Sequence, residues 1–398
     1  MSLGKLYCKF IVKMKPFVVF LALLSFSYII YSQVINVDIN PSSKPKGSLM
    51  LSEIVEYIEY VPLETNDDCV VGQISYFDIS DNYIAISVYQ TKEVFLFSRT
   101  GRFITKIGKQ GQSGSEYLSP GSVYINELMK CIYVRDGHKV LVYDFSGKYV
   151  TTFSTDNKSS AVFMFWNNHF LTGKISVESN ENYYVYGIWD DSMKLVKQAV
   201  KGVPVEIKGQ FNSGAHVNPS ISYYIYKGYP HVKESVLNDT IYQINNIHEF
   251  IPKYIINCGR YGMTAEIKGD TEHFFENFKK YIGGMFFFET SNYLLSKYSY
   301  NGEIIVCYLD KKTSKLLYFD SNDGIPDDYA GGISFWPMRQ VNNSFYAFYN
   351  SYDLLNNYSK QKKIAVKGPS STVLKVQSLI KKLDTEDNPV LIIVRIKE

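Results

Sequence analysis

The chain has 398 residues, and its 42 Lys and Arg against 39 Asp and Glu give a formal net charge of +3. Because this net charge is small and no run of Lys and Arg resembles a nucleic-acid-binding patch, the sequence excludes nucleic acid as a partner. Hydrophobic residues make up 45% of the chain, enough for a large core, and the 34 Tyr and 25 Phe favour β-strands.

The chain begins with a pattern typical of a secretory signal peptide. Several lysines precede the apolar run Phe17–Tyr31, which is followed by the small residue Ser32. The run is shorter than the ~20 apolar residues that a membrane-spanning helix needs. We predict a signal peptide over residues 1–32, with either Met1 or Met14 as the start of translation. The alternative is an uncleaved N-terminal anchor.

No cysteine directly follows the apolar run, because Cys8 precedes it and the next is Cys69. We therefore expect no lipid anchor, and no membrane span once the signal is removed. The rest of the chain reads as a short linker, 33–49, and a single domain, 50–398. These features predict an exported, monomeric protein in the periplasm or outside the cell.

The four cysteines after the signal are far apart in the sequence. No pair has CxxC spacing and no histidine stands at ligand spacing, so the sequence predicts no zinc site. We expect most of them to be buried free thiols, but the sequence leaves open whether any two form a disulfide. They are Cys69, Cys131, Cys258 and Cys307.

An internal repeat dominates the next part of the chain. Tyr83–Ile107 aligns without gaps with Met129–Phe153 at an offset of 46 residues. Each copy reads as a strand, a polar loop, a second strand, a turn and a third strand. Gly101 and Gly147 stand at the turns, where positive φ is needed. A third copy has Met193 at that position, which predicts a different turn.

Further strands are predicted along the rest of the chain, and the last of them is VLIIVRIK near the C-terminus. An amphipathic helix is predicted within Leu374–Pro389, ended by the proline. A ring of sheets needs closure. We therefore expect Val55–Glu64 to complete the sheet formed by the C-terminal end.

Sheets of four strands at 40–50-residue spacing are typical of β-propeller blades. The sequence predicts an all-β fold: a six-bladed β-propeller of four-stranded antiparallel blades, with one short C-terminal helix. Seven blades would fit only if they were packed tightly. A pair of β-sandwiches is the alternative, which the constant offset disfavours.

Several segments carry a resemblance to a known family: IEYVPLET, FLFSRTGRFITKIGKQG, SEYLSP, NDTIY and DNPVLII. In these segments the chain resembles the six-bladed β-propeller family exported by Bacteroides-type bacteria, which is itself similar to NHL-repeat propellers. The resemblance extends from about Leu51 to the C-terminus and implies a fold but no catalytic residues. The family usually has a Gly-Pro-Gly-Glu-like loop where this chain has Ser113–Glu116, which implies a less rigid loop here.

The glycine-rich stretch GKQGQSGSEY, Gly108–Tyr117, raises the question of a phosphate site. Such a site needs a glycine-rich turn that enters a helix. Pro120 and Gly121 follow the stretch and disfavour a helix there. We therefore interpret it as the link between the outer strand of one blade and the inner strand of the next.

Other candidates for chemistry are weak. No GxSxG elbow is present, and the adjacent carboxylates Asp190-Asp191 and Asp327-Asp328 are expected to be solvated. Trp166, Trp189 and Trp336 are expected in blade cores rather than on a sugar-binding surface. We predict no catalytic residues, no metal site and no cofactor. Calcium, which propeller lactonases bind at the ring centre, has no recognisable motif here.

The predicted binding surface is the side of the ring where two kinds of connection emerge. These are the links from one blade to the next and the loops that join the second and third strands of a blade. Functional residues are commonly on loops held by a rigid scaffold. The candidate binding residues, all polar, are Gln110, Gln112, Glu116, Arg135, Asp136 and His138.

Two classes of function fit these observations. The first is a non-catalytic binding or scaffold propeller of the bacterial cell envelope, with an unidentified protein or glycan as its partner. The second is a propeller enzyme of the lyase or lactone-hydrolase type, with scattered residues in the central funnel. Fold alone does not separate the two classes.

Overall fold

The hairpins that the repeat predicts are formed in the computed structural model. It describes residues 34–154, 162–173, 184–202, 221–234, 238–270, 272–320, 322–360 and 364–398. The predicted signal peptide, 1–32, lies outside the described residues. Residues 36–398 form one compact unit.

Four of the sheets have four antiparallel strands each, connected in chain order by hairpins. Alternation of side chains along each strand buries apolar residues on both sides of a sheet, because each sheet is covered by its neighbours. The first sheet contains β3 (Tyr76–Ile79), β4 (Tyr83–Val88), β5 (Glu93–Ser98) and β6 (Phe103–Lys106), and the second contains β7 (Val123–Asn126), β8 (Cys131–Asp136), β9 (Lys139–Asp144) and β10 (Tyr149–Ser154). The third contains β11 (Val162–Trp166), β12 (His169–Gly173), β13 (Tyr184–Asp190) and β14 (Leu195–Lys201). The fourth contains β19 (Gly283–Glu289), β20 (Tyr293–Tyr300), β21 (Glu303–Asp310) and β22 (Lys315–Tyr318).

The fifth sheet is mixed and has nine strands. We call its two halves the first arm and the second arm. The first arm is β1 (Ile35–Asp38), β18 (Glu249–Asn257), β17 (Thr240–Asn246), β16 (Tyr229–Glu234) and β15 (Ile221–Tyr226); the second arm is β23 (Arg339–Val341), β24 (Ser344–Tyr349), β25 (Val390–Ile396) and β2 (Val55–Pro62).

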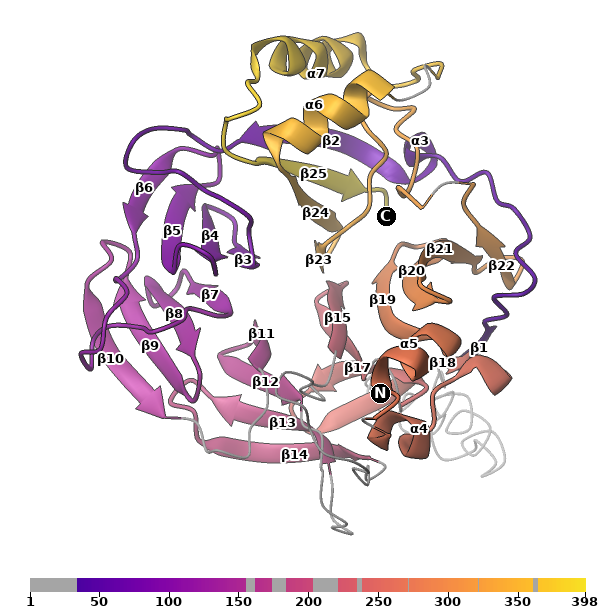
Figure 1. Ribbon diagram of the computed structural model, residues 1–398, viewed down its shortest axis with the longest axis horizontal. Coiled ribbons are helices and arrows are strands. Elements are labelled where there is room, and N and C mark those ends of the chain that lie inside the picture. The colour runs from indigo at the N-terminus through magenta and orange to yellow at the C-terminus, as the bar shows by residue number, and fades with distance from the viewer. Residues whose placement is uncertain are drawn as a thin grey trace, which may run out of the picture. The chain divides into compact units, whose positions relative to one another are not determined.

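The all-β propeller arrangement is confirmed, but the prediction of six separate four-stranded blades is wrong. The sheets are four of four strands and one of nine. The two arms join because Ile225 of β15 and Val341 of β23 form a parallel bridge. Inner strands that run side by side in the same direction can share edge hydrogen bonds in this way. Figure 1 shows the sheets around the ring, with β3, β7, β11, β15, β19 and β23 innermost.

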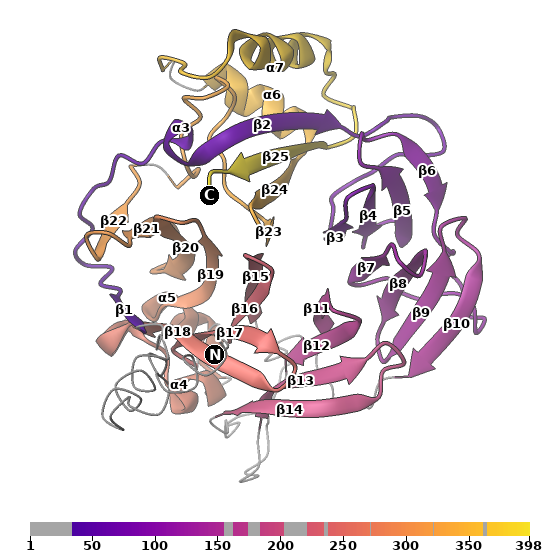
Figure 2. The same ribbon diagram turned by 180° about the vertical axis from the view of Figure 1, so that it is seen from behind.

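The predicted closure of the ring is confirmed. β2 pairs antiparallel with β25 from Val55↔Ile396 to Pro62↔Val390. Figure 2 shows the two strands side by side, although they come from opposite ends of the chain. Part of the predicted linker also pairs with the sheets, since β1 neighbours β18 and Lys46 forms a bridge with Tyr318.

The turns of the repeat are stabilised by the residue that ends the preceding strand. Oδ1 of Asp144 and Oδ1 of Asp190 each accept hydrogen bonds from the backbone N–H groups two and four residues later. Gly147 has φ of 81° and Met193 has φ of 62°, so both turns have the same left-handed residue. The prediction of a different turn at Met193 is therefore wrong. Its side chain is buried in the core with Trp189, which offsets the backbone cost.

The prediction of a single C-terminal helix is also wrong. The helix predicted within Leu374–Pro389 corresponds to α7, but α7 begins at Ser370 and ends at Lys382, before the proline, and it is one of several helices. The C-terminal pair α6 and α7 lies outside β2 in Figures 1 and 2. The described helices are α3 (Leu51–Ile54), the 3-10 turn η1 (Gly259–Tyr261), α4 (Ala265–Gly269), α5 (Phe274–Lys280), α6 (Ser351–Lys360) and α7 (Ser370–Lys382).

The core lies between neighbouring sheets. One cluster joins Leu96 of β5 to Ile132 of β8 and Leu141 of β9, all of them fully buried. All four cysteines of the described chain are free thiols, and all except Cys258 are buried, which confirms the prediction. Burial raises the pKa of Cys69 and of Cys307 to about 12.

A buried polar cluster joins the first arm, the β19–β22 sheet and the second arm. Its centre is Glu289, which is 6% exposed and accepts hydrogen bonds from Tyr254 OH at 2.6 Å and Tyr224 OH at 2.9 Å. Lys311 Nζ lies 2.6 Å from Glu289 Oε1. The side chain of Gln340 bonds both the N–H and the C=O of Glu289. Burial alone would raise the pKa of Glu289, but Lys311 and the hydrogen bonds hold it below its usual range.

His231 belongs to the same cluster and gives the fold a pH dependence. Its Nδ1 bonds the Tyr229 carbonyl at 3.0 Å, and its ring stacks on Tyr224 at 4.7 Å. Burial lowers the pKa of His231 to about 4, so the folded protein keeps a neutral imidazole where the unfolded chain binds a proton. The free energy of unfolding should therefore fall as pH drops from about 6.5 to about 4, by about 3 kcal/mol from this residue.

Urea unfolding of His231→Phe at pH 7 and pH 4.5 tests this expectation. Between the two pH values, the free energy of unfolding of the variant should fall by about 2 to 3 kcal/mol less than that of the unaltered protein. The reason is that phenylalanine at position 231 takes up no proton. His248→Gln, at an exposed histidine, is the control and should behave like the unaltered protein. If the free energy of unfolding of His231→Phe falls as much as that of the unaltered protein, His231 is not the source of this pH dependence.

Candidate functional site

The glycine-rich stretch Gly108–Tyr117 is a link between sheets, as predicted. It connects β6 to β7, and no helix follows it. Gly108 has φ of 61°, and its Cα lies so close to the Tyr143 ring that a side chain would clash. The stretch therefore lacks the helix N-terminus that a phosphate cradle requires.

The predicted binding residues lie together in this link and in the neighbouring β8–β9 turn. Glu116 accepts a hydrogen bond from Ser113 N at 3.0 Å and lies 3.1 Å from Lys109 Nζ. Asp136 accepts hydrogen bonds from the backbone N–H groups of Leu118 and Ser119. Both carboxylates thus hold the link in place.

The other four predicted residues lie in the same link and beside the same turn. Gln110 bonds the Leu118 carbonyl at 3.5 Å, Gln112 and His138 are exposed, and Arg135 is half-buried at the end of β8. None of the six lines either cavity described below. Their role in binding stays a prediction.

The carboxylate pair Asp327-Asp328 is buried, so the expectation that both are solvated is wrong. Asp327 accepts hydrogen bonds from the N–H groups of Tyr329, Ala330 and Gly332. Asp328 accepts two from Ser52 and pairs with Lys367 at 2.8 Å. Every one of these contacts fixes the chain around the β22–β23 link, so the pair is structural.

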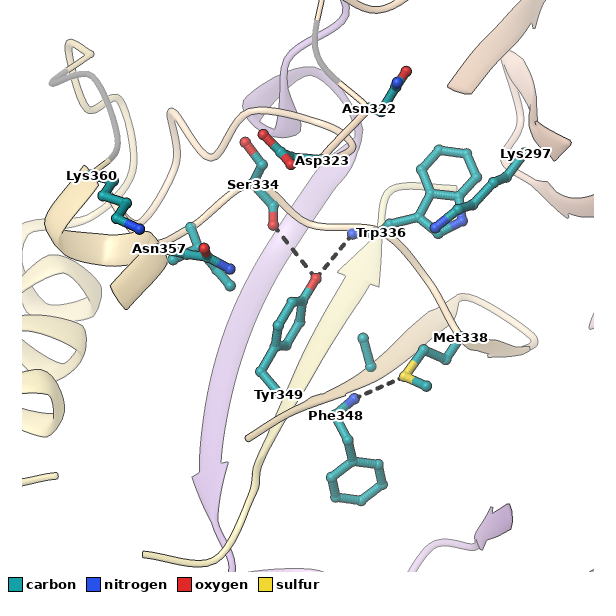
Figure 3. A pocket seen from close by; sticks show the side chains of 12 residues that line it. Lys297, Asn322, Asp323, Ser334, Trp336, Met338, Phe348, Tyr349, Asn357 and Lys360 are labelled. Atoms are coloured by element: carbon teal, nitrogen blue, oxygen red, sulfur yellow. Dashed lines mark hydrogen bonds between the residues drawn. The ribbon is translucent and has the colours of Figure 1, made fainter. Parts of the chain in front are cut away.

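A cavity of about 570 Å³ opens beside that same link. Its walls come from β20, from the segment 322–338, from β24 and from α6. Figure 3 shows Trp336 and Tyr349 in the middle of the lining, with Lys297 beside Trp336 and Lys360 at the opposite side. The β22–β23 link is itself part of the lining, so the cavity lies on the side of the ring where the links emerge.

The aromatic wall is held in a fixed arrangement. Tyr349 OH accepts a hydrogen bond from Trp336 N at 3.3 Å and bonds the Ser334 carbonyl at 3.5 Å. Burial raises the pKa of Tyr349 to about 12, so the hydroxyl stays protonated. The Trp336 ring packs edge-on against Phe288, with centroids 6.2 Å apart. The wall is therefore rigid before any ligand arrives.

Two lysines give this cavity its charge. Lys297 is half-buried on β20, and burial lowers its pKa. Lys360 is exposed at the end of α6. Among the described residues, no carboxylate lies within ion-pair distance of either ammonium group. Asp323 is the carboxylate of the lining, and Asn322 and Asn357 add amide groups.

Of the residues that line this cavity, only Trp336 is a candidate in the sequence, where it is expected in a core. The assignment to a core is correct in that Trp336 is buried, with 8% of its surface exposed. The same residue also lines the cavity. Lys297 is the one residue with a signal in the sequence. It is a charged residue at an inward position of the strand YLLSKYSY, where an apolar residue is expected.

The chemistry that this arrangement supports is the binding of an anion with an apolar face. In the described chain, no group of three or more His, Cys, Asp or Glu residues is placed to hold a metal ion. Over the same residues, no helix combines the length and the apolar composition needed to cross a membrane.

One solved structure shares this fold over nearly the whole chain. It is a Bacteroides fragilis protein described as a candidate exported protein; it superposes with a TM-score of 0.68 at 18% identity over 92% of this chain and 100% of its own. A Bacteroides vulgatus member of the DUF4221 family matches more weakly. Its TM-score is 0.46 at 9% identity, over 88% of this chain and 99% of its own.

No curated protein matches the chain. A family profile described as "Domain of unknown function (DUF4934)" matches residues 32–395, which include all the sheets described above apart from the last residue of β25. The chain therefore belongs to the DUF4934 family.

Proposed function

We propose that this protein is a non-catalytic binding protein of the bacterial cell envelope that holds an acidic oligosaccharide in the cavity between β20, β24 and α6. One observation carries the proposal: a cavity of about 570 Å³ combines a fixed aromatic wall with two ammonium groups, on opposite sides of it, that have no carboxylate partner among the described residues. Aromatic rings stack on the apolar faces of sugars, and lysines pair with carboxylates.

Export is part of the proposal. It is supported by the signal-like N-terminal sequence and by the Bacteroides fragilis protein of the same fold, which is described as a candidate exported protein. An acidic polysaccharide outside the cytoplasm would be accessible to such a protein. The periplasm and the cell surface are both compatible with this function.

Calorimetric titration with an oligogalacturonate, and with a neutral oligosaccharide of equal length, tests the proposal. The acidic sugar should bind, and the affinity should fall with added salt because the contacts are ionic. Lys297→Gln together with Lys360→Gln should weaken binding by about tenfold or more, the value expected for the loss of charge-assisted hydrogen bonds.

A matched control is available on α7. Lys375 and Lys381 are exposed lysines outside the cavity, and Lys375→Gln with Lys381→Gln removes the same charge. This variant should bind as the unaltered protein does. Equal binding of the neutral sugar would refute the acidic ligand, and release of reducing ends over time would refute the non-catalytic role.

A further inference from the structure

A second cavity, of about 630 Å³, lies at the edge of the first arm. It is lined by the ends of β1, β16 and β18, by the segment after β18 and by the start of β19. Asn36 and Asn257 at its mouth are exposed, so the cavity opens to solvent. It shares no lining residue with the cavity beside β24.

A buried lysine lines this cavity. Lys233 is 3% exposed, and its Nζ donates one hydrogen bond, at 2.8 Å, to the carbonyl of Glu234. An ammonium group has three protons to donate. Within the described chain, Lys233 has no other hydrogen bond and no carboxylate within ion-pair distance. Burial lowers the pKa of Lys233, and the charges of Glu234 and Asp239 offset this only in part.

The nearby carboxylate of Glu234 is already occupied. Its Oε1 lies 3.0 Å from Lys268 Nζ of α4, and its Oε2 accepts a hydrogen bond from Asn238 N at 3.0 Å. Lys268 is itself buried, so this ion pair is complete without Lys233. The positive charge of Lys233 is therefore in excess at the wall of the cavity.

The mouth of the cavity carries the opposite charge. Asp38 and Asp239 are both exposed and both line it. Asp38 accepts a hydrogen bond from the Asn257 amide, and Asp239 accepts one from Thr240 OH. Neither carboxylate has a cationic partner among the described residues. The cavity thus combines a buried cation with carboxylates near solvent.

We propose that this cavity binds a small zwitterion, an amino acid or a short peptide, with its carboxylate on Lys233 and its ammonium group toward Asp38 and Asp239. A buried ammonium without a carboxylate is costly for a folded protein. A ligand carboxylate would supply the missing partner. A second negative charge on the ligand would be repelled at the mouth.

Calorimetric titration with triglycine, triglycine amide and N-acetyltriglycine tests the assignment of the two ends. Triglycine should bind. Each of the two blocked peptides, which lacks one of the charges, should bind at least about tenfold more weakly. Equal binding of all three peptides, or no binding of triglycine, would overturn the proposal.

The variant Lys233→Met separates a binding role from a structural one. It should abolish triglycine binding and raise the melting temperature of the free protein, because it removes an unpaired buried charge. Lys268→Met is the matched control and should lower the melting temperature, since it leaves Glu234 without its ion-pair partner. If Lys233→Met also lowers the melting temperature, Lys233 is a structural residue and the proposal is wrong.

Discussion

Replacing Glu289 by alanine is expected to destabilise the protein by about 4 kcal/mol, the largest effect of any single substitution considered for this chain. The change leaves the half-buried ammonium group of Lys311 without the carboxylate that lies 2.6 Å away. It also removes the acceptor for Tyr224 and Tyr254. Because these residues come from the first arm and from the β19–β22 sheet, their interface should loosen. Urea unfolding at pH 7 measures the loss.

Two further variants make this test specific. Glu289→Leu combined with Lys311→Met removes both charges, so it should recover a large part of the lost stability. Asp320→Ala removes one partner of the exposed pair Lys46–Asp320, which has the short separation of 2.7 Å, and should change stability little. If Glu289→Ala is no more harmful than Asp320→Ala, the cluster does not join the sheets.

Asn388→Ala is expected to cost about 3 kcal/mol, because a buried amide that makes three hydrogen bonds to backbone groups is removed. Asn388 is 1% exposed, and its Nδ2 donates to the carbonyls of Glu64 at 2.6 Å and Cys69 at 2.7 Å. Its Oδ1 accepts from Val71 N at 2.7 Å. These bonds attach the segment after β2 to the segment before β25, so they hold the closure of the ring.

Thermal unfolding and hydrogen exchange together test the role of Asn388. The melting temperature should fall by several degrees, and the amide of Val71 should exchange faster than amides in β8 and β9. Asn350→Ala is the control, because Asn350 is exposed and bonds Asp353 on the surface. Unchanged protection of Val71 in Asn388→Ala would show that other contacts hold the closure.

The features predicted correctly from the sequence are mostly local. The strands CIYVRD and KVLVYD coincide with β8 and β9, because alternation and the turn residues are set by neighbouring positions. The pairing of β2 with β25 could be predicted only because a closed ring leaves each end of the chain a single free edge. The turn at Met193 was mispredicted because burial of that side chain, a tertiary effect, outweighed the local preference for glycine.

The functional candidates were much harder to find in the sequence. Lys297, Trp336 and Lys360 lie on three different elements, and no spacing rule relates them. Lys233 is part of an otherwise unremarkable strand, YPHVKE, and the cavity that it lines also includes the segment after β18. Polar loops, in contrast, are visible in the sequence. This explains why the predicted binding residues are loop residues such as Glu116, which the structure shows holding its own link.

By itself, the sequence determined the strands of the repeat, its two glycine turns, the export-like N-terminus and the way in which the two ends close the ring. These follow from periodicity, turn chemistry and composition, which act over a few residues at a time. Only the tertiary structure decided how the sheets join. A single bridge between Ile225 and Val341 makes one nine-stranded sheet out of two arms. It also decided which lysines have no carboxylate partner among the described residues, because the distance between charges depends on packing between residues far apart in the chain.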